Sequence, residues 1–393
     1  TFTGITLTGA DAGNYTIATT LSGNVGQITK KNITASLNAV SGGTYVFTRE
    51  YNGQKNVTQA LDNNYSFAAG AIESEDTVSL TAGTSAYTDK NVGDTKEITF
   101  GGLALDGEDK GNYNLTTTSL TGKVGQITKK DITASLNALN GAYVFTKTYD
   151  GGTDVKQALG NNYSFATGAV ESVDAGKVSL TAGTGAYNDK NVENTKKITF
   201  GNLVLGGDEA ENYNLTTESL TGDVGQITKK NITASLNALG DAYVFTKIYD
   251  GGTDVKQALG NNYSFATGNI VSGETVGLTA GTGAYTDKNV GDTKEITFGG
   301  LALDGEDKGN YNLTTTELSG SVGQITKKNI TASLNALSDV YVFTKTYDGG
   351  TGVKQALGNN YSFATGDIES VDANKVSLTA GTSAYTDKNV GDT

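Results

Sequence analysis

The chain has 393 residues with a formal net charge of −13 at pH 7, and it contains no Cys, His, Trp, Pro or Met. The negative charge has the wrong sign for a nucleic-acid or anionic-lipid partner, and no apolar run approaches the length that membrane insertion needs. Without His or Cys, nucleophilic triads, thiol chemistry and ordinary zinc sites are excluded. We therefore expect no catalytic residues, no cofactor-binding residues and no enzymatic activity.

One block of residues recurs four times along the chain. The sequence Gly-Gln-Ile-Thr-Lys-Lys begins at Gly26, Gly125, Gly225 and Gly323, at intervals of 99, 100 and 98 residues. Two further landmarks keep the same spacing, a Tyr-Asp-Gly or Tyr-Asn-Gly motif and an Asp-Lys-Asn-Val motif. A period of this length is that of a self-sufficient domain and exceeds that of helical solenoid repeats. The sequence therefore predicts tandem domains.

The register of the blocks predicts five segments. Residues 1–27 correspond to the closing strands of a truncated repeat, and residues 325–393 correspond to an incomplete repeat that lacks its last strands. Three complete β-sandwich repeats are predicted between them, at 28–126, 127–226 and 227–324.

The register of the two ends is compatible with two interpretations. In the first, the sequence is a window from a much longer repetitive polypeptide. In the second, subunits polymerise head to tail, and residues 1–27 of one chain complete the open sandwich of its neighbour by strand complementation. The second interpretation gives an inter-chain role to a set of apolar and aromatic residues near the start of the chain: Phe2, Ile5, Leu7, Tyr15 and Ile17.

Within a repeat, apolar residues alternate with a period of two, which is typical of β-strands. In the repeat 127–226 the first such run is Ile132–Ala138. Two later runs, Ile198–Phe200 and Leu203–Leu205, differ in phase, which predicts a β-bulge or a break between them. The segment Asp154–Leu159 shows no strand alternation and could hold a helical turn. Further short strands are predicted near 143–146, 163–166, 178–182, 213–217 and 224–228.

A turn motif with the spacing Asp-x-Gly-x-Tyr-x-apolar lies in the late part of a repeat. Together with a variant that lacks the glycine, it places tyrosines at Tyr15, Tyr113, Tyr213 and Tyr311. In immunoglobulin domains this spacing marks a structural tyrosine corner, in which the hydroxyl group bonds back to the main chain. The alternative is a simple turn that leads into a strand with a half-buried tyrosine.

These observations predict an all-β fold of tandem immunoglobulin-like β-sandwich domains. About seven short strands per repeat fit such a sandwich better than a barrel. The segment Val124–Thr133 carries the last strand of one repeat almost directly into the first strand of the next, without a flexible linker. We therefore expect an extended, semi-rigid rod.

The sequence indicates calcium as a candidate metal, because its acidic turns supply oxygen ligands. The weak candidate ligands are Asp106, Glu108 and Asp109. The corresponding residues differ between the internal repeats, which favours turn chemistry over a fixed, repeating calcium site.

The order of the short motifs resembles that of a known family. From Ile127, one repeat contains Ile-Thr-Lys-Lys-Asp-Ile-Thr, Thr-Tyr-Asp-Gly-Gly-Thr, Asp-Lys-Asn-Val, Ile-Thr-Phe-Gly-Asn-Leu-Val-Leu and Glu-Asn-Tyr-Asn-Leu. This order is similar to the YDG-type repeats, and the related MBG-type repeats, of very large bacterial surface and secreted adhesins of the filamentous haemagglutinin kind. The resemblance covers nearly the whole chain and implies a β-sandwich stalk module on the bacterial exterior. The first repeat departs from it with an Asn at position 52 of its Tyr-Asn-Gly motif.

Two functions follow as expectations. The first is a stalk or filament segment of a bacterial extracellular fibre or adhesin, whose partners are copies of itself, end to end or laterally. The alternative is a repeat that itself binds a host glycan or protein, or that mediates cell–cell adhesion in a biofilm. Ligand binding predicts aromatic residues clustered on one exposed face, whereas a core without Trp would bury most of the tyrosines.

Overall fold

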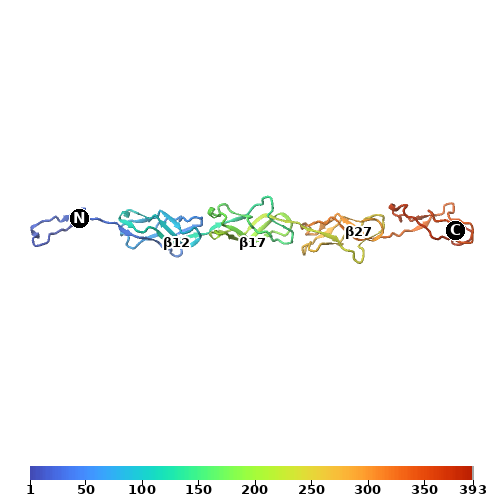
Figure 1. Ribbon diagram of the computed structural model, residues 1–393, viewed down its shortest axis with the longest axis horizontal. Helices are drawn as coiled ribbons and strands as arrows, with labels where there is room; N and C mark the ends of the chain where they lie inside the picture. The colour runs from blue at the N-terminus through green and yellow to red at the C-terminus, as the bar shows by residue number, and fades with distance from the viewer. Residues whose placement is uncertain (392–393) are drawn as a thin grey trace. The chain divides into compact units, whose positions relative to one another are not determined.

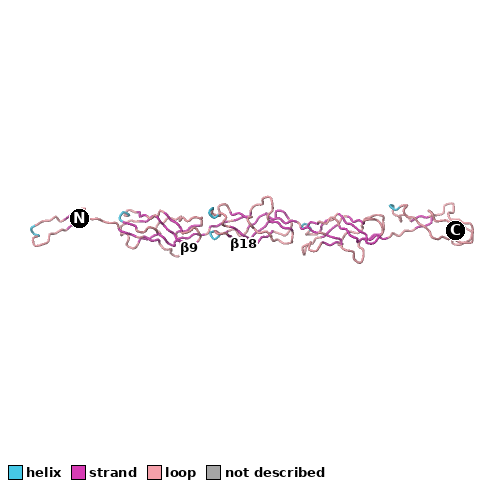
Figure 2. Tube along the Cα trace, viewed as in Figure 1, coloured by secondary structure: helices cyan, strands magenta, loops and turns pink. Residues whose placement is uncertain are grey.

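The computed structural model describes residues 1–391, and nearly all of its regular structure is β (Figure 2). The exceptions are 3-10 helices of three residues, such as η2 (Lys110–Asn112) and η4 (Ala210–Asn212). No helix among the described residues is long and apolar enough to span a membrane. The all-β prediction is therefore confirmed.

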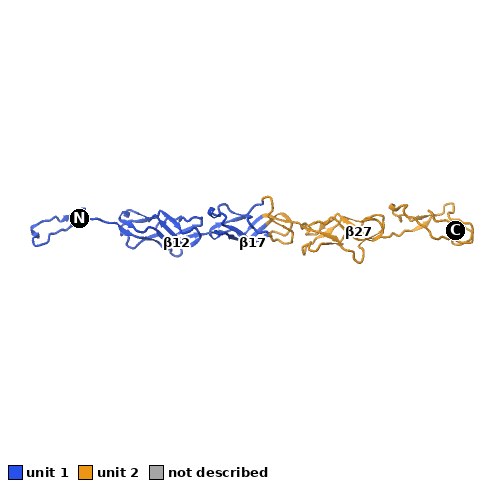
Figure 3. Cartoon of the chain, in the orientation of Figure 1, with its two compact units in different colours: residues 1–139, 157–186, 198–222 blue, residues 140–156, 187–197, 223–393 orange. Residues whose placement is uncertain are grey.

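The chain falls into two compact units (Figure 3), and the repeat 127–226 contributes to both. The first unit consists of residues 1–139, 157–186 and 198–222, and the second of residues 140–156, 187–197 and 223 onward.

In the first unit, the repeat 28–126 is built on a mixed four-stranded sheet that includes β12, labelled in Figure 1. β12 is parallel to β5 and antiparallel to β9, so the last strand of the repeat lies between an early strand and a late one. The order of the sheet is β5 (Phe47–Glu50), β12 (Leu120–Thr128), β9 (Gly93–Gly101) and β8 (Thr84–Tyr87).

Shorter strands of the same repeat form two-stranded pairs. One pair is parallel, β3 (Lys31–Ile33) with β11 (Tyr113–Leu115). The antiparallel pairs are β4 (Ala35–Leu37) with β6 (Tyr65–Phe67), and β7 (Ser79–Thr81) with β10 (Ala104–Asp106). Residues 1–27 contribute one further pair, β1 (Phe2–Thr3) with β2 (Thr20–Leu21).

In the second unit, the repeat 227–324 follows the same plan. Its four-stranded sheet has the order β23 (Phe245–Ile248), β30 (Leu318–Thr326), β27 (Gly291–Gly299) and β26 (Thr282–Tyr285). Its two-stranded pairs are β21 (Lys230–Ile232) with β29 (Tyr311–Leu313), β22 (Ala234–Leu236) with β24 (Tyr263–Phe265), and β25 (Gly277–Thr279) with β28 (Ala302–Asp304). The residues after 324 contribute β31 (Ala332–Leu334) and β32 (Tyr361–Phe363).

The strands of the repeat 127–226 belong partly to each unit. β17, β18 and β20 each contain residues of both. The full set is β13 (Lys130–Ile132), β14 (Ala134–Leu136), β15 (Phe145–Thr148), β16 (Tyr163–Phe165), β17 (Ser179–Tyr187), β18 (Glu193–Gly206), β19 (Tyr213–Leu215) and β20 (Leu220–Thr228).

The core of each repeat lies against its four-stranded sheet. In the repeat 28–126, Ile98 and Phe100 of β9 are fully buried, and the Phe100 ring lies 5.0 Å from the ring of Phe47 on β5. The equivalent rings in the repeat 227–324, Phe245 and Phe298, lie 5.1 Å apart. Burial of such large apolar side chains is the main stabilising contribution in a chain without disulfides.

The break predicted between Phe200 and Leu203 is wrong for the repeat 127–226, because the single strand β18 covers both runs. The buried face does change phase there: Phe200 is buried, and the next inward-facing side chain is Leu203. In the repeat 28–126 the equivalent region is interrupted and forms two separate strands, β9 and β10. In the repeat 227–324 the two strands are β27 and β28. In the repeat 127–226 a single strand, β18, continues through the same region. Asn202 there has a φ of 52°, the left-handed conformation that Asn tolerates better than most residues.

The helical turn predicted at Asp154–Leu159 is wrong, because the segment contains no helix. Its side chains are alternately exposed and partly buried, and the segment ends at the buried Leu159. The short apolar run Val-Lys-Gln-Ala-Leu is ambiguous between helix and strand by pattern alone, and tertiary packing decides it.

Candidate functional site: the junctions between repeats

A buried tyrosine connects the repeat 28–126 to the repeat that follows it. Tyr51, the first residue of the Tyr-Asn-Gly motif, comes directly after β5, and its main-chain N–H donates to the Thr128 carbonyl of β12 at 2.9 Å. Its hydroxyl group donates to Asp174 Oδ2 in the next repeat at 2.6 Å. The Asp174 side chain is 0% exposed and ends the short helix η3 (Ser172–Asp174). A carboxylate in this position needs partners, because an unpaired buried charge is very costly.

Lys90 of the Asp-Lys-Asn-Val motif supplies the positive charge. Its Nζ lies 2.5 Å from Asp174 Oδ1 and 3.0 Å from Glu209 Oε1, both in the repeat 127–226. The same Nζ donates to the Tyr51 hydroxyl oxygen at 2.9 Å. One lysine of the first repeat therefore holds two carboxylates of the second.

Tyr213 completes the arrangement from the side of the second repeat. Its hydroxyl group donates to Asp174 Oδ2 at 2.7 Å and accepts a hydrogen bond from the main-chain N–H of Glu171 at 3.0 Å. Its ring lies 5.3 Å from that of Tyr51 at an interplanar angle of 74°, an edge-to-face contact. Asp174 is thereby held by one tyrosine from each repeat.

Two further contacts explain the other motif residues. Gly53, the last residue of the Tyr-Asn-Gly motif, has a φ of 74°, and a Cβ added to it would lie 2.6 Å from Val173 Cγ2 of the next repeat. Asn212, directly before Tyr213, accepts a hydrogen bond through Oδ1 from the main-chain N–H of Val92 at 2.9 Å. Glycine is therefore required at position 53 both by its conformation and by the close approach of the next repeat.

Each charge in this junction is stabilised by its partners. Burial would raise the pKa of Asp174, but hydrogen bonds from Lys90 and the two tyrosines outweigh that effect and hold the pKa below its usual range. Burial and the hydrogen bond to Asp174 raise the pKa of Tyr51 to about 12. The pKa of Lys90 is raised, because its bonds to Asp174 and Tyr51 outweigh the opposing effect of burial. The junction is therefore an ion pair with two neutral phenols.

The second unit contains the same arrangement between the second and third repeats, with Glu274 in place of the aspartate. The hydroxyl groups of Tyr149 and Tyr311 both donate to the Glu274 carboxylate, and Lys190 forms an ion pair with it. The rings of Tyr149 and Tyr311 lie 5.5 Å apart at 76°, and Val271 N–H donates to the Tyr311 hydroxyl oxygen at 2.9 Å.

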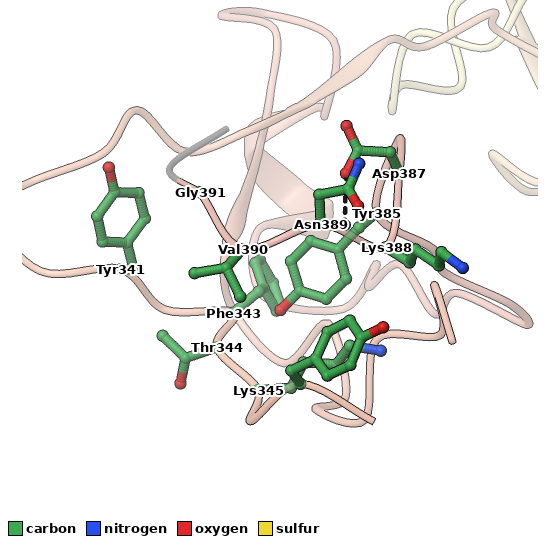
Figure 4. Close-up of a pocket in the computed structure, with 11 residues that line it drawn as sticks. Tyr341, Phe343, Thr344, Lys345, Tyr385, Asp387, Lys388, Asn389, Val390 and Gly391 are labelled. Atoms are coloured by element: carbon green, nitrogen blue, oxygen red, sulfur yellow. Dashed lines mark hydrogen bonds between the residues drawn. The ribbon is translucent and has the colours of Figure 1, made fainter. Parts of the chain in front are cut away.

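At the next junction, Tyr249 and Lys288 of the third repeat both bond to Asp372. The corresponding tyrosine and lysine of the residues from 325 onward are Tyr347 and Lys388. They line an open pocket together with Phe343 and Tyr385 (Figure 4). No carboxylate within residues 1–391 forms an ion pair with Lys388.

The predicted tyrosine-corner residues have two different environments. Tyr113, Tyr213 and Tyr311 are buried, and each hydroxyl group accepts a hydrogen bond from a main-chain N–H about forty residues earlier. Each also donates to a carboxylate; for Tyr113 the acceptor is Asp76, at 2.5 Å. Tyr15 is 72% exposed.

The other residues singled out from the sequence lie outside the junctions. Asp106 pairs with Lys110 at 2.9 Å, Asp109 accepts a hydrogen bond from Thr77 N–H at 2.8 Å, and Glu108 is exposed. Residues 1–391 contain no group of three or more acidic side chains placed to hold a metal ion. The residues assigned to inter-chain complementation are exposed or partly exposed: Phe2, Ile5, Leu7, Tyr15 and Ile17.

Sequence reasoning missed the lysines and carboxylates of the junctions. A signal was present, because the acid recurs at Asp76, Asp174, Glu274 and Asp372, and the last three each follow the lysine of the preceding Asp-Lys-Asn-Val motif by 84 residues. Three of the short motifs that carried the family resemblance, those with the Tyr-x-Gly, Asp-Lys-Asn-Val and Asn-Tyr residues, therefore meet at one place. Chemically, the arrangement can hold two repeats together. Its phenols, lysine and carboxylates are paired with one another by hydrogen bonds and ion pairs.

Comparison with known proteins agrees with this repeat structure. The model of the YDG domain family matches residues 29–120, 128–220 and 228–318. These ranges lie within the predicted repeats 28–126, 127–226 and 227–324. No curated protein and no solved structure gives a significant match to the chain.

Proposed function

This chain belongs to the YDG domain family, and on that premise we propose that it is a structural stalk or filament segment of a bacterial extracellular fibre or adhesin. The observation that carries the proposal is the buried Asp174, which is held by Tyr51 and Lys90 of one repeat and by Tyr213 of its own. A carboxylate shared in this way favours one orientation of each repeat on the next. Such fixed joints are what a projecting stalk requires.

We further propose that each repeat is an immunoglobulin-like sandwich and that joined repeats form an extended, semi-rigid rod. Lys129 alone separates β12 from β13, the first strand of the following repeat. A one-residue connection cannot act as a flexible tether. Together with the polar contacts of the junction, it supports restricted bending between repeats.

The partners that we propose are further copies of the same repeat. The repeat 28–126 carries its own acceptor pair, Asp76 with Tyr113, equivalent to Asp174 with Tyr213. This pair fits the Tyr-x-Gly end of another YDG repeat, whether in the same polypeptide or in a second copy.

The alternative function is direct binding of a host glycan or protein, or cell–cell adhesion. It would need an exposed aromatic face, yet the tyrosines of the complete repeats are buried or only partly exposed. The buried ones are Tyr51, Tyr87, Tyr113, Tyr149, Tyr187, Tyr213, Tyr285 and Tyr311. This distribution favours the stalk. Binding of the chain to a glycan array would favour the alternative instead.

Small-angle X-ray scattering of the full chain tests the stalk proposal. The wild-type protein should scatter as a stiff, extended particle, and the triple variant D174A/E274A/D372A should show greater flexibility and a shorter mean end-to-end distance. A matched control, D106A/D154A/D304A, removes three exposed aspartates and should behave as wild type, because surface charge pairs contribute little. A wild-type chain as flexible as the triple variant would contradict the proposal.

The extracellular location is tested separately. Antibodies raised against the chain should label intact cells of the source bacterium without permeabilisation. Labelling only after permeabilisation would contradict a stalk function, whatever the stiffness of the purified chain.

A further inference from the structure

The loop of the Tyr-Asp-Gly motif is stabilised in the same way in three of the repeats. In the repeat 127–226, Lys147 Nζ lies 2.6 Å from Asp150 Oδ1 and donates to the Gly152 carbonyl at 2.6 Å. Asp150 Oδ1 also accepts a hydrogen bond from Gly152 N–H at 3.0 Å. The equivalent ion pairs, Lys247–Asp250 and Lys345–Asp348, measure 2.6 and 2.8 Å.

The repeat 28–126 has the same loop with an amide in place of the carboxylate. Asn52 occupies the aspartate position, and its Oδ1 accepts hydrogen bonds from Gln54 N–H at 3.0 Å and from Arg49. Arg49 replaces the lysine and is only 8% exposed. No carboxylate within residues 1–391 forms an ion pair with Arg49, and its Nε has no hydrogen-bond partner there. This loop therefore holds a buried cation without a counter-charge, an unfavourable arrangement.

Asn52 is followed by Gly53, one of two Asn-Gly pairs in the sequence; the other is Asn140-Gly141. An asparagine before glycine is the most reactive kind toward intramolecular deamidation, because glycine has no Cβ to hinder attack by its main-chain nitrogen. The Arg49 guanidinium bonds to Asn52 Oδ1, where it polarises the amide and stabilises the negative charge that develops on that oxygen during attack.

From these observations we propose that Asn52 is a self-modification site, which deamidates to aspartate and gives the first repeat the Tyr-Asp-Gly motif of the others. The Gly53 nitrogen forms a bond with Asn52 Cγ and gives up its proton, Nδ2 takes up a proton, the Cγ–Nδ2 bond breaks, and ammonia leaves to give a cyclic succinimide. Water then adds at Cγ, the bond between Cγ and the Gly53 nitrogen breaks, that nitrogen takes up a proton from the water, and an aspartate carboxylate remains.

The surrounding structure fits the aspartyl product. A carboxylate at position 52 lies where the Arg49 guanidinium already bonds, so it supplies the missing counter-charge. Opening of the succinimide in the other direction would give isoaspartate, which inserts an additional carbon into the main chain. That insertion would displace Gly53 from its close contact with Val173 in the next repeat.

Peptide mass mapping of the full-length protein tests the proposal. After incubation at mildly alkaline pH, the peptide that contains residue 52 should gain the mass of an amide-to-acid conversion and should match the same peptide from N52D. Asn140 is exposed in its loop and serves as an internal reference. Retention of Asn52 after conversion of Asn140, or a product at position 52 that is mainly isoaspartyl, would overturn the proposal.

Thermal unfolding gives a second, independent measurement. N52D should raise the unfolding midpoint of the freshly purified protein, and the gain should disappear when Arg49 is also replaced, in R49Q/N52D compared with R49Q. An N52D variant no more stable than wild type, or a gain that persists without Arg49, would overturn the role assigned to the ion pair.

Discussion

The two complete junctions hold the same tyrosine–carboxylate–lysine arrangement with different degrees of enclosure. Around Asp174, the carboxylate is fully buried, Lys90 is 24% exposed, and Glu209 lies 3.0 Å from the lysine nitrogen. Around Glu274, the carboxylate is 4% exposed, Lys190 is 39% exposed, and its second acid, Asp307, lies 3.8 Å away. The contacts are the same in kind, but the first junction excludes more water, so its electrostatic interactions should be stronger.

Removal of the shared carboxylate should have the largest effect and should separate the two junctions. D174A leaves Lys90 without its main counter-charge and two phenols without their acceptor, and it should lower the free energy of unfolding by about 3 kcal/mol or more. E274A should cost less, because Lys190 is better hydrated. Denaturant titration of each variant measures the difference. An equal or larger loss in E274A would contradict the comparison.

Removal of one phenol hydroxyl should have an intermediate effect. Y51F keeps the ring contact with Tyr213 and deletes only the hydrogen bond to Asp174, and we expect a loss of about 1.5–3 kcal/mol, typical of hydrogen bonds to charged groups. Y149F is the counterpart in the second junction. The doubly substituted Y51F/D174A should lose less than the sum of the single losses, and strict additivity would indicate that the two groups do not interact.

Substitution of Gly53 should have a smaller effect on stability, and the matched variant G168A separates the cost of the conformation from that of the contact with Val173. G53A and G168A both place alanine at a φ of 74°, which costs about 1–2 kcal/mol, but only residue 53 has a neighbour, Val173, in the way of the new Cβ. G53A should therefore destabilise the protein more than G168A, by about 1 kcal/mol. If the two variants lose the same stability, Gly53 is not in close contact with the next repeat.

The pH dependence should give the smallest effect at neutral pH and the clearest one at the extremes. The pKa of Tyr51 rises from 10.0 to about 12, so its contribution to stability is complete below pH 10 and is lost as the pH rises through about 12. The pKa of Asp174 lies below its ordinary value of 3.8, so its contribution is present above that pH and is lost as the pH falls further. Tyrosinate absorbance follows the alkaline limb. In D174A the ionisation of the tyrosines should begin at lower pH, and an unchanged titration would contradict the assignment.

The sequence predicts the β-strands and the repeats, but it does not predict the junction contacts, because these join residues that are distant in the chain. Period-two alternation and the fixed block length indicate β-strands and repeats, and spacing alone singled out Tyr213. Its partners are not local: Lys90 and Asp174 are 84 residues apart in the chain and meet only when two repeats dock. The period-two pattern of the strands does not indicate which acid of the next repeat accepts the hydrogen bond of the tyrosine, and only the constant separation of lysine and acid across repeats points to it. The helical turn predicted at Asp154–Leu159 was wrong for a related reason, because contacts with the rest of the repeat decide the conformation of so short a segment.

Parallel pairing between early and late strands should make each repeat resistant to stretching along the chain. In the repeat 28–126, β5 and β12 are parallel over four residue pairs, and β3 and β11 over three. The repeat 227–324 has the same two pairings, β23 with β30 and β21 with β29. When the two ends of a repeat are pulled apart, parallel partners must slide past each other, so all the hydrogen bonds of a pair are stressed together. Antiparallel hairpins open one bond at a time, so a repeat with these parallel pairs should resist stretching better than one built from hairpins alone.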